Sequence, residues 1–154
     1  MEQRINVIEK SKEAFSAIYP LNVYLSKSTI EKPLQDLICH RVSQINGCAY
    51  CLDLHSKDLR AEGETERRIY VLDAWRETPF YSERERAALA WAEAVTKCDV
   101  PDEVYKEATK QFTEEELIDL TIVVNTINFY NRFNIAFKPP VGTYQVGQYA
   151  VQSE

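Results

Sequence analysis

Two capping boxes, each followed by a long run of helix-forming residues, constrain this fold more than any other feature of the sequence. Ser82 is followed three residues later by Glu85, and Thr113 by Glu116. In such a box the hydroxyl and the carboxylate each accept a backbone N–H of the first turn, which starts a helix. The pattern predicts helices over 82–95 and 113–137, the second ended by Pro139 and Pro140.

The rest of the chain also favours helices. Only four of 154 residues are glycine, where average usage gives about eleven, which argues against a turn-rich β-sandwich. Sustained β alternation is absent before the tail. We therefore predict an all-α, single-domain bundle over 1–137, and a tail over 138–154 that is irregular or lies as an arm on a neighbouring subunit. Further helices are expected over 5–18, 20–28, 31–45, 65–77 and 101–111.

Charge and motifs exclude several classes of function. The net charge of −6 argues against binding nucleic acid or an anionic membrane surface. Neither G-x-G-x-x-G nor G-x-x-x-x-G-K-[ST] occurs, so those routes to nucleotide binding are excluded. The sequence shows no membrane span and no secretory signal, which predicts a cytoplasmic protein. Thiols stay reduced there, so the four cysteines are more readily catalytic, metal-binding or incidental than structural disulfides.

The residues that carry chemistry follow Asn46 and Gly47, which suit a helix C-cap followed at once by a new helix. Cys48 is expected in the first turn of that helix, and Cys51 and His55 follow at i+3 and i+7. All three then fall within a face of roughly 60°. A helix N-terminus favours a thiolate, a second thiol can capture a sulfenic acid as a disulfide, and a histidine can accept the first proton.

This stretch resembles the AhpD-like branch of the carboxymuconolactone decarboxylase superfamily. That branch is marked by an upstream Glu followed by S-x-x-N-G-C-x-x-C-x-x-x-H. The pattern is met here by Ser43, Asn46, Gly47, Cys48, Cys51 and His55. The resemblance covers roughly residues 10–138, and it extends through the segments AEGET at 61–65, WRE at 75–77, ERERAALAW at 83–91 and NFYNR at 128–132.

The resemblance implies an AhpD-like helical fold and thiol peroxidase chemistry without an organic cofactor or metal. By position, Cys51 matches the cysteine that attacks the hydroperoxide, Cys48 the resolving cysteine and His55 the relay histidine. The upstream Glu falls at Asp36, which keeps the carboxylate but is one methylene shorter. The residue between the cysteines, often His, is Tyr50, which can donate a hydrogen bond but is a poor proton acceptor near neutrality.

The resemblance also implies partners. The substrate would be a small hydroperoxide, and the reductant an external dithiol, either a dithiol protein or a lipoyl-type carrier. The assembly would be a homo-oligomer, a trimer or hexamer built from dimers.

Three alternatives to this function remain open. Cys48, Cys51 and His55 could ligate zinc, with Cys39 or Asp36 as the fourth ligand. The chain could instead be a non-catalytic thiol redox sensor. It could also be a decarboxylase of a lactone acid, although members with that activity do not rely on a C-x-x-C pair.

Several neighbouring residues have simpler interpretations. His40 follows Asp36 by four residues and could join the relay, but we expect a partly buried histidine satisfied by Asp36 or by a backbone carbonyl. Cys39 and Cys98 are expected to be incidental thiols. The polar residues in the long apolar helix predict an interhelical or intersubunit network made by Asn125, Asn128, Asn131 and Arg132.

Overall fold

Both predicted capping boxes are present in the computed structural model, which describes residues 2–149. The Ser82 hydroxyl accepts the Glu85 N–H at 3.3 Å, and the Glu85 carboxylate accepts the Ser82 N–H at 2.7 Å. Thr113 and Glu116 make the same pair of bonds at 3.2 and 2.9 Å. The boxes start α7 (Glu83–Thr96) and α9 (Glu114–Phe137), as predicted.

The described residues form nine α-helices and one 3₁₀ helix, with no strand, so the all-α prediction is confirmed. None of these helices is long and apolar enough to cross a membrane. The remaining elements are α1 (Val7–Lys10), α2 (Lys12–Ser16), α3 (Tyr19–Leu25), α4 (Lys32–Asn46), α5 (Ala49–Ala61), α6 (Glu66–Tyr70), the 3₁₀ helix η1 (Leu72–Glu77) and α8 (Asp102–Thr109).

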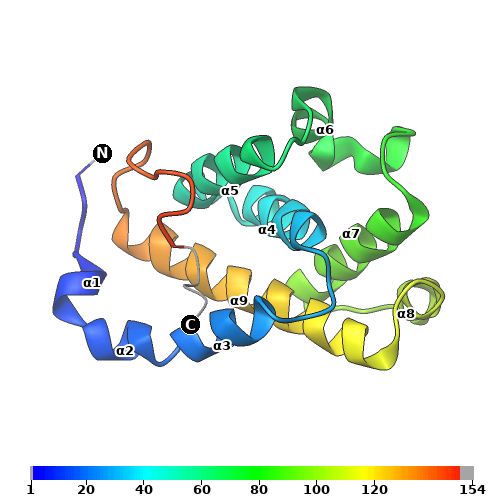
Figure 1. The fold of residues 1–154 in the computed structure, drawn as a ribbon, viewed down its shortest axis with the longest axis horizontal. Coiled ribbons are helices and arrows are strands. Elements are labelled where there is room, and N and C mark those ends of the chain that lie inside the picture. The colour runs from blue at the N-terminus through cyan, green and yellow to red at the C-terminus, as the bar shows by residue number, and fades with distance from the viewer. Residues whose placement is uncertain (1, 150–154) are drawn as a thin grey trace.

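The long helix α9 runs the length of the molecule, and α3, α4, α5, α7 and α8 pack against it, whereas α6 and η1 lie farther from it (Figure 1). Helices α4, α5 and α7 lie on one side of it, and α1–α3 follow its other side. The core between α4, α7 and α9 is made of aliphatic side chains, which include Leu37, Ile38, Val42, Leu89, Leu120 and Val124. Burial of such side chains contributes roughly 1.5–3 kcal/mol each to the stability of the fold. This core holds α4 and α9 together, and α5 packs against both of them.

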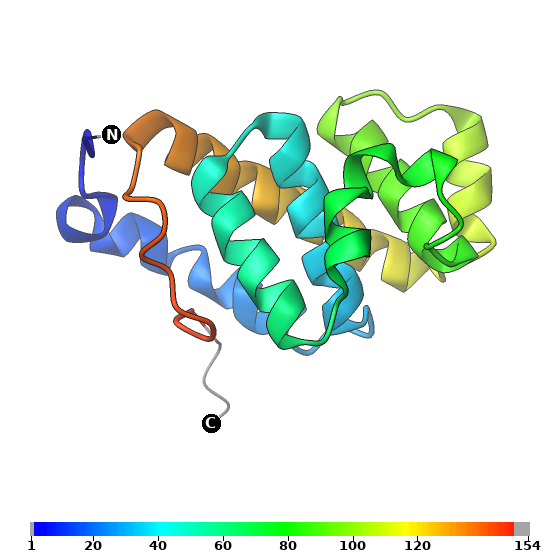
Figure 2. The same ribbon diagram turned by 90° about the horizontal axis from the view of Figure 1, so that it is seen from above.

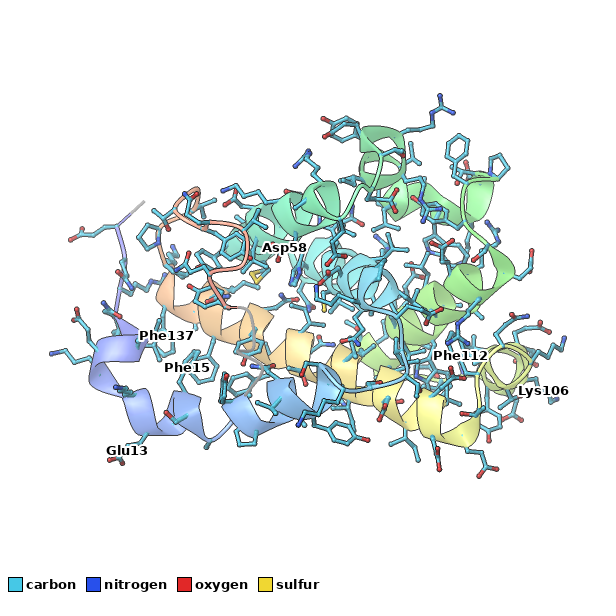
Figure 3. All side chains as sticks on the ribbon, viewed as in Figure 1. Glu13, Phe15, Asp58, Lys106, Phe112 and Phe137 are labelled. Carbon is cyan, nitrogen blue, oxygen red and sulfur yellow. A yellow bond between two sulfur atoms is a disulfide. The ribbon has the colours of Figure 1, made fainter. Side chains whose placement is uncertain are left out.

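Two of the helices expected from the sequence are interrupted. The helix predicted over 5–18 divides into α1 and α2 at Ser11, whose backbone leaves the helical conformation at φ −147° and ψ 54°. Figure 3 shows Phe15 of α2 reaching toward the end of α9, where it packs on Phe133 with the ring centroids 5.5 Å apart. The helix predicted over 65–77 divides into α6 and η1, which turn so that Ile69, Leu72 and Trp75 are all buried. Packing therefore overrides local helix propensity in both places.

Residues 138–149 have no regular secondary structure and lie against α5 of the same chain (Figure 2). The Tyr144 hydroxyl donates to Asp58 Oδ1 at 2.7 Å, and Lys57 donates to the Tyr144 carbonyl at 3.1 Å. Tyr144 is buried. Residues 150–154, which complete the tail proposed from the sequence, lie outside the described residues.

One buried carboxylate joins three elements around the core. Glu93 of α7 accepts from Arg41 Nε of α4 at 2.8 Å, from Trp75 Nε1 at 2.9 Å and from Arg76 at 2.7 Å, the last two on η1. Its side chain is 7% exposed. Glu93 therefore fixes the position of α4, on which the cysteine helix rests.

We predict that Glu93→Ala lowers the free energy of unfolding by about 3–5 kcal/mol, because it leaves the largely buried Arg41 without its carboxylate partner. Urea denaturation measures this loss. Glu77→Ala, at an exposed position of η1, is the matched control and should change stability by about 0.5 kcal/mol or less. Equal losses in the two variants would contradict a structural role for Glu93.

Candidate active site

The sharp junction between α4 and α5 brings the cysteine pair to a helix N-terminus. Gly47 ends α4 in the left-handed conformation at φ 68°, which glycine adopts without a steric penalty. The Gly47 N–H bonds to the Gln44 carbonyl at 3.2 Å, and the Cys48 N–H bonds to the Ser43 carbonyl at 3.1 Å. These are the two bonds of a Schellman motif. The next residue of the chain, Ala49, already belongs to α5.

Cys48 and Cys51 form a disulfide, with their Cα atoms 5.4 Å apart (Figure 3). The expectation that Cys48 lies inside the first helical turn is wrong by one position. Cys48 is the N-cap of α5, with extended backbone, and its Sγ accepts the Cys51 N–H at 3.3 Å. The reason is the Schellman turn, whose last residue cannot yet be helical. Both cysteines are 1–2% exposed.

His55 of α5 and Asp36 of α4 lie close together, but they do not form a direct hydrogen bond. His55 Nδ1 lies 3.9 Å from Asp36 Oδ1, beyond hydrogen-bonding distance. Lys32, one turn earlier on α4, pairs with the other oxygen, Asp36 Oδ2. The shorter aspartate side chain therefore approaches the histidine and leaves a gap that one small polar group could bridge.

Burial dominates the electrostatics of these two groups. It raises the pKa of Asp36 to about 6, although the Lys32 ammonium acts in the opposite direction. It lowers the pKa of His55 to about 3, assisted by the charges that His40 and Lys32 can carry. At neutral pH His55 is therefore a neutral imidazole, and the proton that exchanges most readily near neutrality is on Asp36.

His40 is a buried neighbour of this pair, and its simpler interpretation is wrong. We expected Asp36 or a backbone carbonyl to satisfy it, yet Nδ1 of His40, like Nδ1 of His55, has no hydrogen-bond partner among the described residues. Burial, with a smaller contribution from the Arg60 charge, lowers the pKa of His40 to about 4. Asp36 has turned toward Lys32 instead, so two neutral imidazoles share one buried region.

Tyr50, expected as an accessory donor, faces the tail. Its hydroxyl lies 2.8 Å from the Tyr149 hydroxyl. Burial raises the pKa of Tyr50, and the bond to Tyr149 adds to the shift. Tyr50 therefore stays protonated and can donate a hydrogen bond, but it cannot replace a basic histidine.

The polar residues of α9 form an interhelical network within one chain, which confirms one of the two predicted forms. Asn46 Nδ2, at the end of α4, donates to Asn128 Oδ1 at 2.9 Å and to Asn131 Oδ1 at 2.8 Å. Asn131 in turn donates to the Ser43 hydroxyl at 3.0 Å. Asn125 and Arg132 were also expected in the network, but they face outward and are exposed.

One contact of the cysteine pair escaped the sequence analysis. Asn134 Nδ2, on the last turns of α9, donates to Cys51 Sγ at 3.3 Å. A partial signal was present, because Asn125, Asn128, Asn131 and Asn134 recur every three residues, although the first of them faces outward. A spacing of three places successive residues near one another on a helix face, so Asn134 belongs with Asn128 and Asn131.

The other two cysteines lie apart from the disulfide. Cys39 is half-buried and Cys98 is exposed, and both are free thiols. Burial raises the pKa of Cys39, with a smaller contribution from Asp36. Cys39 is therefore protonated and unreactive at neutral pH. Within residues 2–149, no three His, Cys, Asp or Glu side chains are arranged to hold a metal ion.

The comparisons agree with this geometry. The family model described as "Carboxymuconolactone decarboxylase family" matches residues 10–94, more than half of the chain. The chain belongs to the carboxymuconolactone decarboxylase family. Within that family it lies in the AhpD-like branch.

Relatives of this family match nearly the whole chain. The uncharacterized protein YdfG of Bacillus subtilis is 42% identical over 139 residues, which cover 88% of this chain and 95% of YdfG. The crystal structure of ATU0492 from Agrobacterium tumefaciens covers 93% of this chain and 100% of its own, with 38% identity and a TM-score of 0.88. ATU0492 has no known function and has been suggested to be an AhpD-type antioxidant defence protein.

A more distant structure agrees in fold alone. A peroxidase-related protein from Silicibacter, uncharacterized itself, is 23% identical with a TM-score of 0.73, covering 82% of this chain and 69% of its own.

The neutral buried state of His40 predicts how stability depends on pH. Between pH 7 and pH 5 the unfolded chain protonates His40, with a pKa near 6.5, whereas the folded chain does not, with a pKa of about 4. The unfolded state binds more protons, so stability falls as the pH falls, by about 2 kcal/mol from this residue. In His40→Gln this part of the loss should disappear.

Urea denaturation of both proteins at pH 7 and pH 5 measures the difference. Asp36 is present in both, so its opposite contribution cancels in the comparison. The same pH dependence in His40→Gln and in the wild type would contradict burial of a neutral His40.

Proposed function

We propose that this protein is a thiol-dependent peroxidase that reduces small hydroperoxides with the Cys48–Cys51 pair. The observation that carries the proposal is the disulfide at the N-terminus of α5. His55 lies on the same helix, and Asp36 of α4 is 3.9 Å from it, so an acid–base pair accompanies the disulfide. The family contains decarboxylases as well. The juxtaposition of two thiols that can form a disulfide favours redox chemistry.

The proposed first step is attack by the Cys51 thiolate on the terminal oxygen of the hydroperoxide. The O–O bond breaks, Cys51 becomes a sulfenic acid, and the alkoxide leaves as an alcohol after taking one proton. Asp36 can supply this proton, because its raised pKa keeps it partly protonated near neutrality. Neutral His55 can relay the proton by accepting it at one ring nitrogen and donating from the other.

In the second step the Cys48 thiol condenses with the sulfenic acid. An S–S bond forms between Cys48 and Cys51, and one water leaves. In the oxidised pair the Cα atoms are 5.4 Å apart, within the usual range for a disulfide, so the fold of the α4–α5 junction accommodates the product of this step.

The third step is reduction by an external dithiol, which we propose is a dithiol protein or a lipoyl-type carrier. Thiol–disulfide exchange gives the two thiols back and leaves the carrier as a disulfide. Both sulfurs are buried when oxidised, so side chains over the start of α5 must move before the carrier can reach Cys48. A reducing compartment such as the cytoplasm and a trimer or hexamer built from dimers remain part of the proposal.

We predict that the wild-type protein consumes an alkyl hydroperoxide in the presence of a dithiol, and that Cys51→Ala abolishes this activity because the attacking thiol is gone. Cys48→Ala should lose turnover but still consume about one equivalent, leaving a sulfenic acid on Cys51. Peroxide assays and trapping with dimedone measure these outcomes. Cys98→Ser, at the exposed free thiol, is the control and should turn over like the wild type.

Mass spectrometry adds a direct test of the redox step. Treatment of the reduced protein with hydroperoxide should remove two hydrogens, and the loss should map to Cys48 and Cys51. Wild-type turnover in both cysteine variants would end the proposal, and so would stoichiometric zinc bound at the pair.

We also predict that Asp36→Asn lowers kcat/KM for the hydroperoxide by about a hundredfold, the usual scale for loss of an acid–base group. Asp36→Glu adds one methylene, which can close the 3.9 Å gap to His55, and should at least retain the wild-type rate. Asp53→Asn is the matched control, because Asp53 is a carboxylate of α5 that pairs with Lys57 and not with His55. Wild-type rates in Asp36→Asn would exclude Asp36 from the proton relay.

A further inference from the structure

Three asparagines of α9 line the side of the helix that faces the α4–α5 junction. We call Asn128, Asn131 and Asn134 the asparagine ladder. The first two accept hydrogen bonds from the side-chain amide of Asn46, the residue before Gly47. The third donates a hydrogen bond to Cys51 Sγ. Figures 1 and 2 both show the C-terminal half of α9 beside α5. The ladder therefore connects α9 to both ends of the junction that presents the cysteines.

The two sulfurs receive different donors. Cys48 Sγ accepts the Cys51 N–H at 3.3 Å and is at the N-cap, where the helix dipole favours negative charge. That placement by itself favours a thiolate on Cys48. Cys51 lies one turn inside α5, and its own N–H is directed at the other sulfur. If Cys51 is the attacking thiolate, it needs a donor of its own.

Burial makes this donor important. Cys51 is 2% exposed, so bulk water cannot solvate a thiolate there, and an unsolvated buried charge is strongly disfavoured. Asn134 is half-buried and uncharged, and its Nδ2 is 3.3 Å from the sulfur. Among the described residues, it is the side chain that donates a hydrogen bond to Cys51 Sγ.

We propose that Asn134 is a further catalytic residue, whose side-chain amide binds the Cys51 sulfur and stabilises its thiolate for attack. The inference rests on the proposed peroxidase function for its meaning in catalysis. A hydrogen bond to an ionised acceptor is stronger than one to a neutral acceptor, so the amide favours the thiolate over both the thiol and the disulfide. The proton leaves Cys51 toward the His55–Asp36 pair.

Other ionisable groups lie on the elements around Cys51, and a substitution at Asn134 removes none of them. Helix α5 carries Cys48, Tyr50 and His55, while α4 carries Asp36 and His40. The tail adds Tyr144 and Tyr149 through their bonds to α5. A change in the pKa of the Cys51 thiol in an Asn134 variant can therefore be attributed to the lost amide, because the charges of these groups are the same in both proteins.

The test measures the pKa of the Cys51 thiol directly. In a Cys48→Ser background, the rate of Cys51 alkylation by iodoacetamide is followed over pH, with the modified peptide identified by mass spectrometry. Asn134→Leu keeps the side-chain volume but removes the donor. We expect the midpoint of the alkylation rate against pH to rise by about one pH unit or more. At a pH well below that midpoint, the alkylation rate should fall about tenfold.

Asn134→Ala serves as a second variant in case leucine disturbs packing, and far-UV circular dichroism reports whether each variant folds. Asn125→Leu is the control, because Asn125 is exposed on the same helix; its midpoint should match the parent protein. An unchanged midpoint in folded Asn134→Leu or Asn134→Ala would overturn the inference and leave the peroxidase proposal intact.

Hydroperoxide consumption by proteins that retain Cys48 separates the two proposals. If Asn134→Leu raises the Cys51 midpoint and lowers kcat/KM for hydroperoxide by a similar factor, with little change in the dithiol step, both are supported. If the midpoint rises but the wild type consumes no hydroperoxide, Asn134 still binds the thiolate and the peroxidase proposal fails.

Discussion

The site depends on the hydrogen-bonded turn at Gly47. Without a residue that accepts φ 68°, α4 could not end and α5 begin within two residues. Because of that short connection, Cys48 is both the last residue of the Schellman motif that ends α4 and the N-cap of α5. The Asn46 amide donates to Asn128 and Asn131 of α9, both buried, and so holds the turn against that helix. The geometry of the disulfide thus follows from a backbone constraint.

Burial sets the chemistry around that turn. The same low-dielectric surroundings raise the pKa of Asp36 and lower those of His40 and His55. The Asp36 carboxyl group therefore titrates closer to neutral pH than either imidazole, and both imidazoles stay neutral. A group that titrates near neutral pH can both give and accept a proton during turnover. Asp36 meets that condition better than either histidine, although histidine would be the usual expectation.

Much of the fold could be predicted from the sequence, because helix starts and stops are local signals. The capping boxes at Ser82 and Thr113, the stop before Pro139 and the glycine at 47 all act over four or five residues. The breaks at Ser11 and within 65–77 could not be predicted in this way. There, the packing of Phe15 on Phe133 and the burial of Leu72 and Trp75 outweigh the local preference for one continuous helix.

For the site, the sequence by itself determined the order of reactive groups along α5, since Cys48, Cys51 and His55 are related by helical spacing alone. Only the tertiary structure decided which groups meet them. Asn134 reaches Cys51 across 83 residues, and Glu93 joins Arg41 across 52. His55 of α5 comes to 3.9 Å from Asp36 of α4, and His40 is buried without a partner at Nδ1. These contacts depend on how whole helices pack, and packing distances carry no periodic signal in a single sequence.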